Sequence, residues 1–259
     1  MLAIAGGPSL CCNKPSSVFS SQIFRSSTGR CNKLMSPIET RSEKQNTTRN
    51  TRDSQTPKTE YKDSVFDLLF INGCRQAFGR VAGWQSPRSW NEGYQGMVEV
   101  SHALAAGKSA AEQQTAVLKG FPRVPTWFRQ LFPYSDWGAA LNARITPLFF
   151  SWLVGPCEVV EVTIQDKKLR SGVHIHKCRY LETSGCTGLC VNLCKLPTQY
   201  FFTEELGMPL TMEPNFEDLS CEMIFGQIPP RPEDDPALQQ GCFSKCPTSS
   251  TSAVCPKLR

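Results

Sequence analysis

The sequence predicts an α+β fold, in which a helical N-terminal half packs on a small β-hairpin and a cysteine-bearing helix, followed by an irregular C-terminal tail. Apolar residues recur at helical spacing, with capping signals, between residues 63 and 120. After Gly155-Pro156 the pattern changes to the strict alternation that is typical of half-buried strands. Four of the 13 cysteines then fall within residues 178–194, so a further helical stretch carries an unusual density of thiols.

Residues 1–38 have the composition of an organelle transit peptide. They contain four basic residues, eight serines and no acidic residue, which fits a secretory signal poorly and leaves a disordered tail as the alternative. Residues 39–62 are almost free of apolar side chains and predict a disordered linker. Removing the four positive charges of residues 1–38 lowers the formal charge from +5 to +1. The basic composition therefore gives no reason to expect a nucleic-acid partner.

The folded domain is predicted to span residues 63–246. It divides into a helical part, 63–155, and a cysteine-rich α+β part, 156–246, and residues 247–259 form a flexible tail. The longest apolar run, Leu148–Val154, is far shorter than the roughly 20 residues that cross a bilayer. We therefore expect no transmembrane segment and at most a peripheral contact with a membrane.

Three helices are predicted in the N-terminal half. The first begins at Asp63, where the string DSVFDLLF places a capping residue before an acid in the first turn, and Gly73 is a candidate disturbance within it. The second spans about 91–106, and the third opens with the capping box Ser109-Ala-Ala-Glu112 and ends near Gly120. The stripe that the second helix should bury consists of Tyr94, Met97, Val98, Ser101, Leu104 and Ala105.

Residues 121–152 hold nine of the 25 aromatic residues. One interpretation is a core built with large side chains. The other is an aromatic slot or an interfacial surface for a long apolar ligand, and the two can hold for different residues. The candidates for contact with such a ligand are Trp127, Phe128, Phe132, Phe149, Phe150 and Trp152.

Two strands are predicted at 158–165 and 172–180, joined across Asp166–Ser171. Val173 and Ile175 form the apolar face of the second strand. A solvent-facing role explains the polar residues between them better than a metal site does. The side chains predicted to share that opposite face are His174, His176 and Cys178.

Beyond the cysteine-rich stretch, Pro197 is predicted to end or kink the helix. A further helix should stop at Gly207, with a short strand near Pro209–Met212 after it. The remainder of the chain, from Glu213 onward, is rich in proline and acidic residues and is expected to form an irregular cover.

The crowded cysteines need a common explanation. Gly185 and Gly188 favour a helix that starts near Thr187, which leaves Cys186 on a loop. Thiolates in such numbers suit an iron–sulfur cluster, zinc or copper(I), although no standard C-x2-C pair is present. Burial as small apolar side chains is the alternative for any single cysteine. The metal-ligand candidates are Cys178, Cys186, Cys190, Cys194 and Cys221, with Cys242 and Cys246 in reserve.

Several long strings make the chain similar to a known family. They are DSVFDLLFINGCRQ, SWLVGPCEV, KCRYLE, GCTGLCVNLCKLPTQ, MEPNFEDLSC and FGQIPP, in this order over about residues 63–246. In these strings the chain resembles the plant Dwarf-twenty-seven family of plastid β-carotene isomerases, and within it the "-like" branch. The resemblance implies a chloroplast protein that contains iron, as a mononuclear centre or an iron–sulfur cluster. It also implies interconversion of all-trans and 9-cis β-carotene, upstream of strigolactone synthesis.

The chemistry requires one double bond of a conjugated polyene to weaken for long enough to rotate. An iron centre can achieve this by transient electron exchange, and a positioned acid can achieve it by brief protonation. Glu182 and Glu222 are candidates for that acid, against the plainer interpretation of ordinary surface carboxylates. A redox or electron-transfer protein and a structural zinc module remain the alternative functions.

Overall fold

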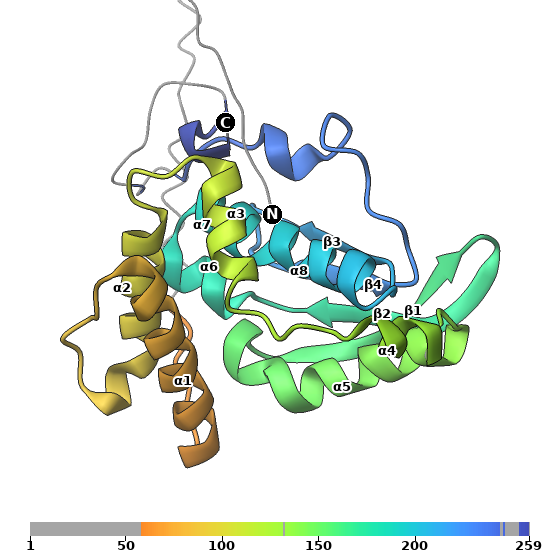
Figure 1. The fold of residues 1–259 in the computed structure, drawn as a ribbon, viewed down its shortest axis with the longest axis horizontal. Coiled ribbons are helices and arrows are strands. Elements are labelled where there is room, and N and C mark those ends of the chain that lie inside the picture. Colours follow the sequence, from red (N-terminus) through yellow and green to blue (C-terminus); the bar gives the residue numbers. More distant parts are fainter. Residues whose placement is uncertain (1–57, 132, 244–245, 247–253, 259) are drawn as a thin grey trace, which may run out of the picture. The chain divides into compact units, whose positions relative to one another are not determined.

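The computed structural model describes residues 58–131, 133–243, 246 and 254–258, all of which belong to one compact unit, Gln55–Arg259. The predicted transit peptide and the linker up to residue 57 lie outside the described residues. The last residues of the predicted linker are instead held against the folded domain, because Thr59 and Tyr61 hydrogen-bond to Glu182. The fold is α+β, as predicted, with helices around a four-stranded sheet (Figure 1).

The N-terminal helices follow the predicted pattern. Helix α1 (Val65–Ala82) starts at a capping box formed by Ser64 and Asp67 and continues through Gly73 without interruption. A short turn, η1 (Trp90–Glu92), leads into α2 (Gly93–Ala105), and the predicted stripe of α2 is buried throughout. Helix α3 (Ala110–Leu118) begins at the predicted capping box of Ser109. Local capping and periodicity were sufficient to place all three helices.

An ion pair fixes the start of α1 against the rest of the domain. The guanidinium of Arg179 binds the Asp63 carboxylate through two nitrogens, at 2.6 and 2.7 Å. Its carbon also lies 3.8 Å from the ring centre of Tyr94 on α2. Because Arg179 is buried, this bidentate and stacked arrangement provides the partners that a buried charge needs.

The aromatic segment forms α4 (Thr126–Leu131) and the long α5 (Asp136–Val154), which runs alongside the sheet (Figure 1). Trp152 is buried, but most of the other aromatic rings of the segment are not. The interpretation of this segment as an aromatic core is therefore wrong for most of its residues. Those that stay largely exposed are Trp127, Tyr134, Trp137, Phe149 and Phe150.

The sheet is larger than the predicted hairpin. Strands β1 (Cys157–Ile164) and β2 (Lys167–Ile175) are joined by a tight turn at Gln165 and Asp166, both with positive φ, which is shorter than the predicted loop. Strand β3 (Leu210–Pro214) was expected, whereas β4 (Cys221–Phe225) was not. All neighbours are antiparallel in the order β1-β2-β4-β3, so β4 lies inside the sheet. The irregular cover predicted from Glu213 is thus partly a central strand.

The cysteine-bearing stretch is a series of short helices. After α6 (Arg179–Ser184) the chain continues through α7 (Thr187–Leu189), η2 (Cys190–Lys195), α8 (Leu196–Tyr200) and η3 (Phe201–Glu205), of which η2 and η3 are π-helical. The helix starts at Thr187 as predicted. Pro197 does not end it, because the widened π-turn comes just before the proline, where the missing N–H would otherwise break the ladder.

The C-terminal segment returns to these helices. It contains η4 (Pro236–Gln239) and, at the end of the chain, η5 (Pro256–Leu258). The buried carboxylate of Asp235 binds the buried ammonium of Lys195 at 2.7 Å. Residues 254–258, predicted as flexible tail, pack instead against α7. No helix in the described part of the chain has both the length and the apolar content that crossing a bilayer would need.

Candidate functional site

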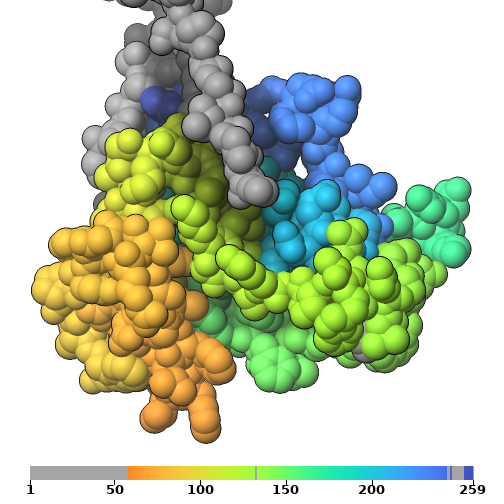
Figure 2. Space-filling model, in the orientation of Figure 1, coloured from red at the N-terminus to blue at the C-terminus, as the bar shows by residue number. Residues whose placement is uncertain are grey.

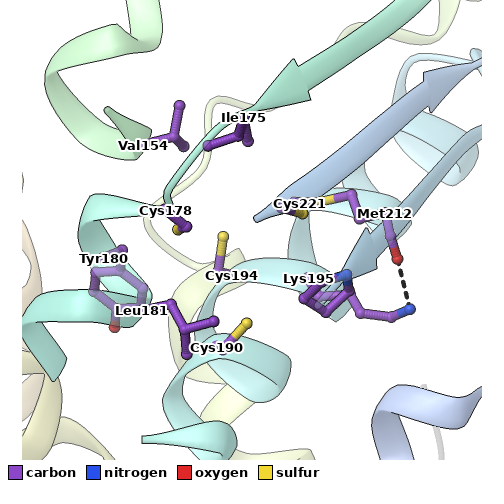
Figure 3. A pocket seen from close by; sticks show the side chains of 11 residues that line it. Val154, Ile175, Cys178, Tyr180, Leu181, Cys190, Cys194, Lys195, Met212 and Cys221 are labelled. Atoms are coloured by element: carbon purple, nitrogen blue, oxygen red, sulfur yellow. Dashed lines mark hydrogen bonds between the residues drawn. The ribbon is translucent and has the colours of Figure 1, made fainter. Parts of the chain in front are cut away.

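Four thiols converge on one small internal cavity (Figure 3). Cys178, Cys190 and Cys221 are buried, and Cys194 is partly buried. The volume of the cavity is about 10 Å³, roughly the space of one water molecule. The rest of its lining consists of Val154, Ile175, Tyr180, Leu181, Lys195, Met212 and Pro214.

Two of the thiols are brought together by backbone pairing. The N–H of Cys178 donates to the carbonyl of Leu219 at 2.6 Å, and Ile175 pairs with Cys221 across β2 and β4. Strand β2 therefore ends at Ile175, and the chain turns so that Cys178 caps the N-terminus of α6. The prediction that Cys178 shares a strand face with His174 is wrong for this reason.

The other two thiols come from the π-helix η2. Cys190 and Cys194 are its first and fifth residues, and both point into the cavity (Figure 3). The i→i−5 pattern is visible at its end, where the N–H of Leu196 donates to the carbonyl of Val191. Such π-turns are rare and concentrate at functional sites. Cys190 and Cys194, four residues apart, therefore both face the cavity, but on a wider helix than an α-helix.

Burial controls the protonation of the four thiols. It raises the pKa of each of them, and the pKa of Cys194 reaches about 12. Neighbouring thiols raise the pKa of Cys190 and Cys221 further, while the positive charge of Lys195 lowers it. A cation among the thiols would reverse these shifts, because a coordinated thiol loses its proton.

The four thiols are a donor set that more than one metal uses. Four cysteine thiolates are the usual ligands of iron–sulfur clusters and also suit zinc. Across the described residues, no three His, Cys, Asp or Glu side chains are drawn together tightly enough to hold a metal ion. The four sulfurs instead surround a void.

Comparison with known proteins gives the family. Residues 152–234, which include all four cavity cysteines, match the family described as "Beta-carotene isomerase D27-like, C-terminal". The "Beta-carotene isomerase D27, chloroplastic" of Medicago truncatula is 39% identical over 199 residues, which cover 75% of this chain and 78% of that protein. The chain belongs to the D27 family. The D27 protein of the same description from Arabidopsis thaliana is 39% identical over 206 residues, covering 78% of each chain. No solved structure matches the chain significantly.

The remaining predicted ligands of this D27-family member lie elsewhere. Cys186 is the N-cap of α7 and does not line the cavity. Its pKa is raised by burial and also by Cys246 and Cys255, which places its thiol beside the C-terminal segment. Cys242, a reserve candidate like Cys246, contacts those same two thiols. The structure thus separates the predicted ligands into a cavity group and a C-terminal group.

The two candidate acids are both outside the cavity. Glu182 accepts hydrogen bonds from Thr59 and Tyr61 and pairs with Lys177 at 2.7 Å. Burial alone would raise the pKa of Glu182, but the hydrogen bonds from Lys177 and Thr59 outweigh it and lower the pKa. Glu222 points away from Cys221, toward the open face of the sheet. There its carboxylate contacts the His174 ring at 2.5 Å.

The aromatic candidates fall into different places. The ring of Trp152 stacks on Phe70 of α1 at 6.0 Å, and its N–H donates to the carbonyl of Phe149. Trp127 contacts Phe128 edge to face on α4. Phe132 lies outside the described residues. None of the other five lines the thiol cavity, although Val154, two residues after Trp152, does.

Sequence reasoning missed one group at the site and one nearby surface. Lys195 follows Cys194 directly in the sequence. Its charge is buried in a pair with Asp235, which is 40 residues away and gave no signal in the sequence. The first turns of α1 carry apolar side chains that are exposed. Together with the C-terminal half of α5 they form a surface that we call the α1–α5 ridge. Its residues are Val65, Phe66, Leu69, Phe70, Leu148 and Phe149.

Proposed function

We propose that this protein is a chloroplast carotenoid isomerase that uses thiolate-bound iron to interconvert all-trans and 9-cis β-carotene or a related carotenoid. Its product would supply the synthesis of strigolactones or related hormones. The observation that carries the proposal is the convergence of four cysteines within the segment that defines the D27 family. Isomerase activity and the chloroplast location agree with the names of both relatives.

The residues that would hold the iron are Cys178, Cys190, Cys194 and Cys221. Bound iron would supply one-electron exchange with the polyene, which lowers the order of a double bond. The chain itself provides an apolar environment, because the side chains of Ile175, Leu181 and Met212 line the cavity. The candidate acids Glu182 and Glu222 do not line the cavity, so they would not act beside the iron.

The substrate must approach from outside the cavity. A volume of about 10 Å³ cannot admit any part of a C40 hydrocarbon chain. A large exposed apolar surface is the α1–α5 ridge, where Val65, Phe66 and Leu148 are 79%, 75% and 76% exposed. In Figure 2 the end of α1, in orange, projects next to α5, in green. Exposed apolar clusters of this kind mark membrane or ligand contacts.

Helix α5 connects this ridge with the thiols. Leu148 and Phe149 are exposed, Trp152 is buried against Phe70, and Val154 lines the cavity. One and a half turns of helix therefore lead from the surface to the site. We infer that the ridge takes carotene from a plastid membrane, with which the protein makes a peripheral contact.

The test is anaerobic purification, metal analysis and incubation with all-trans β-carotene in liposomes, followed by isomer-resolving chromatography. We expect iron in the protein and formation of a 9-cis product. Iron with no isomer formed would favour an electron-transfer role. Zinc with no isomer formed would favour a structural module, and an isomer formed after complete removal of iron would overturn the role of the metal.

A further inference from the structure

The C-terminal segment carries a second group of thiols, separate from the cavity. Cys246 and Cys255 are buried, Cys242 is partly buried, and Cys186 lies beside them at the N-cap of α7. The thiol of Cys242 hydrogen-bonds with that of Cys255 and also with that of Cys246. These thiols lie within hydrogen-bonding reach of one another, whereas the four cavity cysteines line a void. Such proximity allows two of the sulfurs to pair.

Backbone contacts hold this segment against the helix that carries the cavity cysteines. The hydroxyl of Thr187 donates to the carbonyl of Gly241 at 2.8 Å, and the amide of Asn192 donates to the carbonyl of Lys257 at 2.6 Å. Gly188 leaves room for the side chain of Lys257, which a Cβ there would meet at 2.6 Å. The segment is therefore attached to α7 and η2 on both sides of Cys190.

The same contacts select one pair of cysteines. The N–H of Cys255 donates to the carbonyl of Gln240 at 2.8 Å, so the chains on either side of the pair run close together. Cys242 is partly exposed, whereas Cys255 is buried, with 1% of its surface accessible. A reagent can thus reach the thiol of Cys242, and the buried thiol of Cys255 is the neighbour available to pair with it. A disulfide requires this proximity of both backbone and sulfur.

We propose that Cys242 and Cys255 form a reversible disulfide that joins the two stretches of the C-terminal segment, around Gly241 and Lys257, which hydrogen-bond to the helix of the thiol cavity. The two thiols lose two protons and two electrons, and one S–S bond forms. The disulfide of a thiol-exchange protein accepts the electrons and protons and becomes a dithiol, so the step is balanced. Burial and the hydrogen bonds from neighbouring thiols raise the pKa of Cys242 to about 12, so little thiolate is present at neutral pH and the exchange is expected to be slow.

The pair is tested on the full-length protein with oxidised and reduced dithiothreitol, followed by mass spectrometry of tryptic peptides. Trypsin cleaves after Lys245, which separates Cys242 from the peptide that contains both Cys246 and Cys255. We expect oxidation to join the two peptides with loss of two hydrogens, and reduction to release them. The join should persist in Cys246→Ser and disappear in Cys255→Ser, while the control Cys157→Ser should leave it unchanged.

A second measurement does not depend on any variant. Hydrogen exchange of the backbone around Thr187 to Asn192 should slow several-fold on oxidation, because the disulfide would join the two stretches that bind Thr187 and Asn192 and restrict their separation. Three results would overturn the proposal. They are a Cys242 that still reacts with iodoacetamide after oxidation, a cross-link that persists in Cys255→Ser but not in Cys246→Ser, and a metal ion retained by these thiols that prevents the cross-link.

Discussion

The ammonium of Lys195 lies 2.7 Å from the carboxylate of Asp235, and both side chains are almost completely buried. The same ammonium donates to the carbonyl of Met212 at 2.7 Å, and Asp235 also accepts from the N–H of Ala237. This pair joins the π-helix η2, strand β3 and the C-terminal segment. Because Lys195 follows Cys194 and lowers the pKa of Cys190 and Cys221, it also contributes positive charge to the cavity.

Replacement of Lys195 by methionine should be strongly destabilising. It leaves the Asp235 carboxylate buried without its partner, and breaking a buried pair on one side costs about 3–5 kcal/mol. The measurement is the urea midpoint, read by circular dichroism. A double variant, Lys195→Met with Asp235→Leu, removes both charges and should recover most of the loss. Equal midpoints for the single and double variants would show that the pair is not coupled.

Loss of single cavity thiols should remove the metal. Cys190→Ala and Cys194→Ala are each expected to abolish iron retention, because each deletes one of the four soft donors. Cys255→Ala should retain it, since that thiol belongs to the C-terminal group. The readout is iron per protein after anaerobic purification, with circular dichroism to confirm folding. Full iron content in either of the first two variants would refute the ligand set.

The features that the sequence predicted well are those set by neighbouring residues. The capping boxes at Ser64 and Ser109 and the buried stripe of α2 depend only on residues within a few turns. The turn of the first hairpin was misplaced because Gln165 and Asp166 accept positive φ, which lets β2 begin earlier. Local signals therefore fixed the elements more reliably than their exact connections.

The features that the sequence could not predict depend on distant pairing. Strand β4 is only five residues long, and it pairs with β2 on one side and β3 on the other, both distant in sequence or unpredictable from its own residues. Cys178 does not lie on its predicted strand face, because its N–H donates to the carbonyl of Leu219 in the segment before β4. Likewise, the sequence placed Cys186 on a loop before the helix but gave no reason to separate its thiol from that of Cys190 as a ligand. That separation arises from the return of the C-terminal segment to α7.

Acid should weaken the domain through Glu182. Its pKa is lower in the folded protein than the usual value near 4.5, so its stabilising contribution is complete above that value and is lost as the pH falls through the folded pKa. We expect the free energy of unfolding of the wild type to fall more steeply below about pH 4.5 than that of Glu182→Gln. Urea titrations between pH 3 and 6 provide the measurement. Parallel pH profiles for the two proteins would contradict this role.

The α1–α5 ridge should determine binding to lipid and carotene. Phe66→Ser and Phe149→Ser each remove a ring from an exposed surface, and burying such a ring contributes about 1.5 kcal/mol or more. The double variant should therefore bind β-carotene liposomes at least roughly tenfold more weakly in flotation assays.

The matched control for the ridge is Ile228→Ser, which removes an equally exposed apolar side chain after β4. It should leave liposome binding unchanged, and iron content should be the same in all variants because none of these residues lines the thiol cavity. The aromatic residues of α4 offer a second comparison, since Trp127 is also exposed. If Trp127→Ser weakens binding while the ridge variants do not, the contact lies on α4, and the path along α5 from surface to thiols loses its support.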